Sequence, residues 1–186
     1  MAEIRVGALA ANLVGTVLAI VLCVAGVWLA RMLPHHVRFN DWHALGLLGS
    51  FVALLPAHEF LHGLGLRLFA NVPWQHIKFG VMWRALMPYC HCQVPVSVRA
   101  YRRMALLPLW GTGSLALAAL VAFPSDWLGF IAGFAVAACV GDVWMVAKLR
   151  PFQETLLVRD SPSTIGCDVL AEPPAPDGGQ ASGIRS

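Results

Sequence analysis

Charged residues are scarce in this chain. Asp, Glu, Lys and Arg together make up 12% of its 186 residues, whereas about 25% is typical of a soluble domain. Hydrophobic residues make up 58%. We therefore interpret the chain as an integral membrane protein with one compact membrane domain.

The chain also lacks the patterns that bind nucleic acids or nucleotides. It has no basic run interleaved with aromatic residues and no glycine-rich loop that could hold a phosphate. Its five cysteines are odd in number and scattered, and two of them lie inside apolar segments, so no disulfide framework is indicated. We expect neither a nucleic-acid partner nor a nucleotide.

Four apolar segments are long enough to cross a bilayer, which takes about 20 helical residues. The first is too long for the hydrophobic core of a signal peptide, so we expect it to be retained. A tight turn at 124–126 makes the last two segments an antiparallel pair. The expected spans are residues 6–30, 44–69, 104–123 and 127–149.

Basic residues predict the orientation of these spans. The loop between the second and third spans carries five Lys or Arg residues and no acidic residue. Positive charge is concentrated on the cytoplasmic side of membrane proteins. We therefore expect this loop and both termini to lie in the cytoplasm.

The same loop contains two stretches in which apolar and polar residues alternate, as they do in strands. One runs from Ile77 to Trp83 and the other from Cys90 to Val98. They predict a small β-hairpin within residues 76–98, although an interfacial loop with chance alternation is the alternative.

The end of the chain differs in composition from the rest. Residues 160–186 are rich in Pro, Gly and Ser and lack periodicity, so we expect a disordered tail. The predicted fold is an all-α polytopic membrane protein, with about four transmembrane helices and a small β-hairpin in a membrane domain over residues 1–159.

The most informative pattern is the string from His58 to His62, His-Glu-Phe-Leu-His, within the second span. Residues four apart share a helix face, so His58 and His62 can bind one metal ion. Glu59 lies about 100° around the helix, where it can act as general base on a metal-activated water. Polar residues inside a membrane helix are costly and usually functional. The alternative is two histidines that bond neighbouring groups, with Glu59 protonated or paired with Arg67.

A zinc site needs a third protein ligand and an open position for water. Asp142 is the only acidic residue inside the fourth span. Because the second and fourth spans run in the same direction, a rise of 1.5 Å per residue places His58, His62 and Asp142 at about the same depth, roughly 21–27 Å from the outer edge. Asp142 is therefore the expected third ligand. The rival ligands are His91, Cys90 and Cys92 in the hairpin, because imidazole and thiolate both suit zinc.

Substrate-binding residues are harder to infer. Asn12 in the first span lies in the same half of the membrane and could bond a substrate carbonyl, although a contact between helices is the alternative. The edge of the hairpin could hold an extended substrate by strand addition. The candidate substrate-binding residues are Asn12, His91, Val94 and Val96.

These residues resemble the zincin-peptidase family of small bacterial membrane proteins, which is similar in design to the site-2-protease class of intramembrane metalloproteases. The resemblance covers roughly residues 44–152. It is carried by the motif at 58–63, the loop at 89–92, the basic residues 99–103, Pro108 and the pair at 141–142. It implies a Zn²⁺ cofactor held by the two histidines and a carboxylate of a later helix. It also implies a location in a bacterial inner membrane.

The sequence therefore predicts a zinc metalloendopeptidase that works in the cytoplasmic half of the bilayer. Its expected partners are membrane lipid and a peptide or transmembrane protein substrate, which Glu59-activated water hydrolyses. The alternative function is a non-catalytic membrane metal-binding scaffold derived from such a peptidase. A haem or metal carrier is a third interpretation, but it predicts histidines on facing helices.

Overall fold

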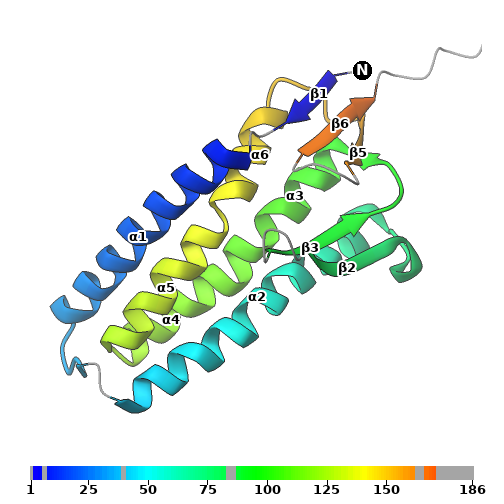
Figure 1. Ribbon diagram of the computed structural model, residues 1–186. Helices are drawn as coiled ribbons and strands as arrows, with labels where there is room; N and C mark the ends of the chain where they lie inside the picture. Colours follow the sequence, from blue (N-terminus) through cyan, green and yellow to red (C-terminus); the bar gives the residue numbers. More distant parts are fainter. Residues whose placement is uncertain (1, 6–7, 39–40, 83–86, 162–165, 171–186) are drawn as a thin grey trace, which may run out of the picture.

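A computed structural model of the chain describes residues 2–5, 8–38, 41–82, 87–161 and 166–170. Its helices lie roughly side by side, and the strands gather at one end of the bundle (Figure 1). The helices are α1 (Ala8–Met32), α2 (Asp41–Ala70), α3 (Val98–Pro108), α4 (Ser114–Ala122), α5 (Asp126–Ala138) and α6 (Val140–Leu149).

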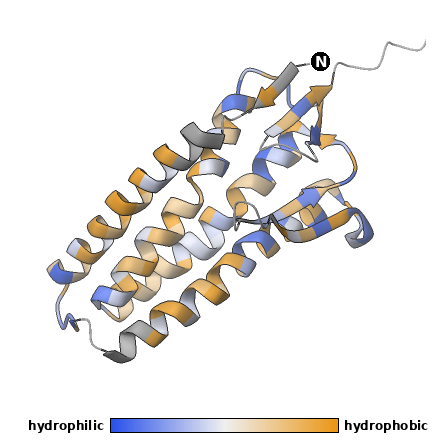
Figure 2. Ribbon diagram, in the orientation of Figure 1, coloured by the Kyte–Doolittle hydropathy of each residue, from blue (hydrophilic) through white to orange (hydrophobic). Residues whose placement is uncertain are grey.

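Within the described part of the chain, four helical segments are long and apolar enough to cross a membrane, as the sequence predicted. They are Leu13–Met32, Leu45–Ala70, Val98–Ala122 and Asp126–Leu149. Figure 2 shows hydrophobic residues along these helices and more hydrophilic residues around the strands. The third segment begins six residues earlier than residue 104, because the Ser97 hydroxyl accepts a hydrogen bond from the Ala100 N–H (3.2 Å) and so caps α3.

The third and fourth segments are irregular helices. A π-helical turn, η2 (Leu109–Gly113), joins α3 to α4, and the Thr112 hydroxyl donates to the Pro108 carbonyl (2.9 Å). The fourth segment breaks at Cys139, whose backbone (φ −84°, ψ −4°) separates α5 from α6. Breaks of this kind commonly occur at functional sites. Here the second break lies three residues before Asp142.

Close helix contact joins α1 to α5. A Cβ atom on Gly26 would collide with the backbone oxygen of Gly129, and one on Gly133 with that of Leu22. Small residues let membrane helices approach in this way. The end of the bundle away from the strands is held by Asp126, which accepts hydrogen bonds from Arg31 (Nε, 2.8 Å; Nη2, 3.2 Å).

The predicted hairpin is present in the loop between α2 and α3. A one-turn 3-10 helix, η1 (Trp74–His76), leads from α2 into its first strand. The strands β2 (Ile77–Met82) and β3 (Met87–Cys92) pair antiparallel, and the Gln93 N–H bonds the His76 carbonyl at their base (2.9 Å).

The second strand of the hairpin was predicted too far along the chain. It ends at Cys92 rather than running to residue 98, because Pro95 has no N–H to continue the ladder. Val94 lies in the following loop, and Val96 begins β4 (Val96–Ser97), which pairs with β5 (Leu157–Asp160).

A four-stranded antiparallel sheet covers this end of the bundle, in the order β1-β6-β5-β4. It includes β1 (Ala2–Arg5), β5 (Leu157–Asp160) and β6 (Gly166–Leu170). The prediction of a disordered tail from residue 160 is therefore wrong for Gly166–Leu170. Cys167 and Val169 are buried there, and the strand is stabilised by β1 at the opposite end of the chain, a pairing that local composition cannot reveal. The chain is mostly helical with small antiparallel sheets, not all-α.

Candidate metal centre

The two histidines of the motif lie one turn apart on α2 and face each other. Their Nε2 atoms are 3.2 Å apart. His62 Nδ1 donates a hydrogen bond to the Met104 carbonyl on α3 (3.3 Å). A histidine that donates through one ring nitrogen keeps a lone pair on the other. The second nitrogen of His62 is therefore free to bind a metal.

Asp142 on α6 faces both histidines. Its Oδ2 lies 3.3 Å from Nε2 of His58, and its Oδ1 lies 3.3 Å from Nε2 of His62. In a tetrahedral zinc site with bonds of 2.0–2.1 Å, neighbouring ligand atoms are about 3.3–3.4 Å apart. The separation between the two Nε2 atoms, and that between each Nε2 atom and its nearest Asp142 oxygen, are close to this value.

The carboxylate of this cluster has few partners. Among the described residues, Oδ2 of Asp142 is buried without a hydrogen bond, and it lies 3.3 Å from Nε2 of His58. Burying such groups inside an apolar helix bundle is costly unless something joins them. A cation would accept lone pairs from both imidazoles and the carboxylate at once. The donor set therefore fits a zinc ion.

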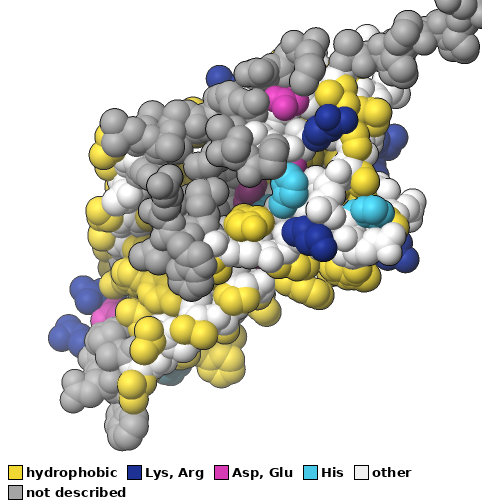
Figure 3. Space-filling model, turned by 45° about the vertical axis from the view of Figure 1, so that its right-hand side comes forward, with side chains coloured by type: hydrophobic (Ala, Val, Ile, Leu, Met, Phe, Trp, Pro, Cys, Tyr) yellow, Lys and Arg dark blue, Asp and Glu magenta, His cyan; other side chains and the backbone are white. Residues whose placement is uncertain are grey.

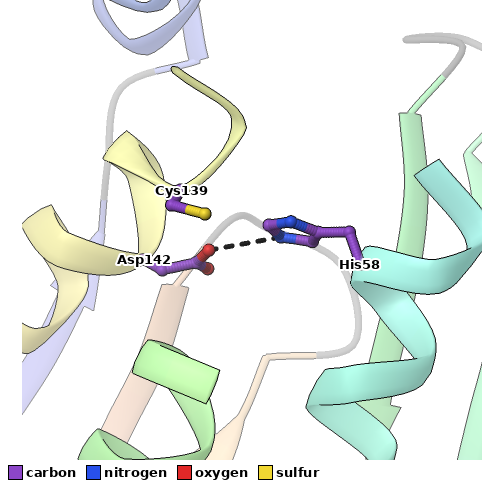
Figure 4. A group of neighbouring side chains, drawn as sticks. All are labelled: His58, Cys139 and Asp142. Atoms are coloured by element: carbon purple, nitrogen blue, oxygen red, sulfur yellow. Dashed lines mark ion pairs between the residues drawn. The ribbon is translucent and has the colours of Figure 1, made fainter. Parts of the chain in front are cut away.

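Cys139 is a neighbour of the cluster that the sequence did not suggest. Its Sγ and one ligand atom each of His58 and Asp142 all lie within 4.8 Å of one another. Figure 4 shows the thiol and the carboxylate pointing from the same chain segment toward the imidazole. The thiol is buried and donates to the Ala135 carbonyl (3.3 Å). The spacing of three residues between Cys139 and Asp142 was the available signal, since it places both on one helix face.

Glu59 lies between the cluster and the hairpin. The backbone N–H of Cys90, on β3, and the side chains of His58, His62 and Asp142 are all near enough to the Glu59 carboxylate to act on its charge. The motif's carboxylate thus lies beside the two imidazoles and faces a strand from another part of the chain.

A second carboxylate contacts the same strand. Oδ2 of Asp160, on β5, accepts a hydrogen bond from the Cys92 N–H (2.9 Å), and its Oδ1 accepts one from the Tyr101 hydroxyl (2.8 Å). Burial raises the pKa of Asp160, although these two hydrogen bonds act in the opposite direction. Burial also raises the pKa of the Cys90 and Cys92 thiols. Sequence reasoning missed Asp160 because it assigned this segment to the tail.

The remaining candidates lie away from the histidines. His91 is on β3 with Nδ1 3.9 Å from Oδ2 of Asp160. Val94 and Val96 line a shallow cavity at the end of α2, together with Asn71 and Leu157. The side chain of Asn12 lies outside the described part of the structure. Of the possible third ligands, the structure brings Asp142 to the histidines, and not the hairpin residues.

The surface around the hairpin is mixed in character. Figure 3 shows hydrophobic side chains over much of the helical part of this face, with basic and histidine side chains gathered toward the strands. Acidic side chains lie in the same region, beside the histidines. Basic and acidic side chains also lie at the opposite end of this face, at the lower left of the view, so the charged groups are found at both ends of the bundle.

A family model described as "putative zincin peptidase" matches residues 51–157. The chain belongs to this family. Membership implies zinc as the cofactor. The matched segment contains the histidine motif, Cys139 and Asp142, but neither α1 nor Asp160. No match was found among curated proteins or solved structures.

Proposed function

We propose that this zincin peptidase is a membrane-embedded zinc endopeptidase that hydrolyses peptide bonds of membrane-associated substrates. The observation that carries the proposal is the cluster of His58, His62 and Asp142, in which the two Nε2 atoms are 3.2 Å apart and each lies 3.3 Å from an oxygen of the carboxylate. Glu59 beside this cluster supplies the base that a hydrolytic site needs.

Each residue has a role in the proposed reaction. His58, His62 and Asp142 would hold the ion. Bound zinc would polarise the scissile carbonyl and lower the pKa of the attacking water. Glu59 accepts a proton from that water and passes it to the nitrogen of the leaving amine. The Cys90 N–H, which faces the Glu59 carboxylate, stabilises its charged form.

The substrate class follows from where the site lies. The histidines and Asp142 are on helices long and apolar enough to span a membrane, near the end that carries the strands. A transmembrane substrate satisfies its own backbone hydrogen bonds, so it must unwind before cleavage. The Cys92 N–H already donates to Asp160, and the Cys90 N–H faces Glu59. An extended substrate at this edge of β3 would therefore pair with the carbonyl groups of the strand.

The proposed location is a bacterial inner membrane with both termini in the cytoplasm. The N-terminal strand, the hairpin loop and the segment after α6 all lie at the same end of the bundle (Figure 1). That end carries the loop rich in Lys and Arg, which favours the cytoplasmic side.

The test is the Glu59→Gln variant, with Glu154→Gln as its control because Glu154 is an exposed carboxylate on the same end of the molecule. The substrates are a quenched-fluorescent soluble peptide and a single-span peptide reconstituted with the protein in lipid vesicles. Glu59→Gln should bind zinc as the wild type does and lose about 10²-fold or more of its cleavage rate. A wild-type protein that binds zinc but cleaves neither peptide would support the non-catalytic scaffold instead.

A further inference from the structure

We propose that Asp160 is a positioning residue for Glu59, acting through strand β3. The inference rests on the proposed function, because it concerns how the general base is held. Asp160 follows the segment that the family model matches. No hydrogen bond of the described residues joins Asp160 to the histidine motif or to Asp142. Its hydrogen-bond donors are the Cys92 N–H on β3 and the Tyr101 hydroxyl on α3, and of these two elements β3 is the one that leads to Glu59.

The pairing of the hairpin shows which way its backbone groups point. The Gln93 N–H bonds the His76 carbonyl, so His91, two residues earlier, also exchanges hydrogen bonds with β2. The intervening residues Cys90 and Cys92 therefore direct their N–H groups to the opposite edge. The first of these groups faces the Glu59 carboxylate, and the second donates a hydrogen bond to Asp160 (2.9 Å).

The two contacts lie close together on one rigid element. Residues two apart in a strand are separated by about 6.6 Å. A displacement of β3 that breaks the Cys92 contact would therefore also move the Cys90 N–H relative to Glu59. Asp160 therefore holds β3 at Cys92, two residues from Cys90, whose N–H faces the general base Glu59.

Asp160 itself is well anchored. Its side chain is only 12% exposed, and the Tyr101 hydroxyl on α3 holds its second oxygen. Its backbone belongs to β5, where it pairs with Cys167 of β6. Hydrogen bonds to a buried charged group are stronger than those at the surface, and losing one leaves a buried donor unsatisfied. The contact is therefore able to restrain the strand.

Amide hydrogen exchange resolved at Cys90 and Cys92, in the full chain with zinc, separates positioning from a local contact. Asp160→Ala should speed exchange at both amides by about tenfold or more. Glu59→Ala should speed exchange at Cys90 alone. Faster exchange in Asp160→Ala at Cys92 alone would overturn the proposal, because the two contacts would then be independent.

Kinetics on the soluble quenched-fluorescent peptide supply the second readout. Asp160→Ala should lower kcat by about tenfold or more while KM and zinc content stay near the wild-type values. Asp160→Asn, which keeps one acceptor oxygen, should restore part of the loss, and Glu154→Gln should behave as wild type. An unchanged kcat, or a loss of zinc in parallel with kcat, would contradict a positioning role.

Tyr101→Phe keeps the test available if Asp160→Ala does not fold. It removes one hydroxyl that anchors Asp160 and leaves β3 untouched, so it should give a smaller change in the same direction in both readouts. Wild-type exchange and kcat in both Tyr101→Phe and Asp160→Asn would overturn the proposal. If the wild type cleaves no peptide, the proposed function fails, while exchange still decides whether Asp160 holds β3 against Glu59.

Discussion

The carboxylate of Asp142 on α6 lies 3.3 Å from Nε2 of His58 on α2. From the rise per residue of a helix, the sequence predicted that these residues lie at the same depth in the membrane. In the structure their side chains are also in contact. The break at Cys139 lets the start of α6 turn its first residues toward α2. Because of this contact, Asp142 is the third ligand available to a metal ion held by the two histidines.

Cobalt substitution distinguishes a site with three protein ligands and a position for water from a site closed by a fourth protein ligand. With His58, His62 and Asp142 as ligands, Co²⁺-loaded protein should lack the intense near-ultraviolet charge-transfer absorption of a cobalt thiolate. The neighbouring Cys139 makes the measurement decisive, because its Sγ lies within 4.8 Å of ligand atoms of His58 and Asp142. A thiolate band that disappears in Cys139→Ser would show a four-ligand site, which is closed to water and typical of structural zinc.

Substitution of Gly129 tests the close contact between α1 and α5. The Cβ atom of Gly129→Ala would come within 2.5 Å of the Gly26 carbonyl oxygen, so the helices must separate. We expect a loss of stability of about 1–3 kcal/mol, measured as thermal unfolding in detergent. Gly15→Ala is the matched control, since a Cβ atom there meets nothing within 4 Å. Equal melting temperatures for the two variants would show that the contact contributes nothing.

The parts of the fold that sequence predicted are those encoded locally. Long apolar runs predicted the four spans, and helical spacing placed His58 and His62 on one face. The sheet was missed because β6 is stabilised by β1 from the other end of the chain. Asp160 was missed for the same reason, since its contacts with Cys92 and Tyr101 join segments far apart in the sequence.

The reactivity of Cys90 reports on the environment beside Glu59. Burial raises the pKa of the Cys90 thiol, and the nearby charges of Glu59 and Asp160 raise it further. A raised pKa means less of the reactive thiolate at a given pH. Alkylation of Cys90 at pH 8, followed by peptide mass spectrometry, should therefore be much slower in the folded protein than in the denatured chain. Equal rates would mean that the thiol is neither buried nor near these carboxylates.

Zinc binding to the Asp142→Ala variant tests the central claim, that His58, His62 and Asp142 hold one zinc ion. Zinc content and affinity are measured on the purified protein, with Glu154→Ala as a control for loss of an exposed carboxylate. The wild type, Glu59→Gln and Glu154→Ala should each bind one zinc ion per chain. Asp142→Ala should lose more affinity than the about 10–100-fold that removal of an outer-shell partner costs. Wild-type affinity in Asp142→Ala would contradict the account.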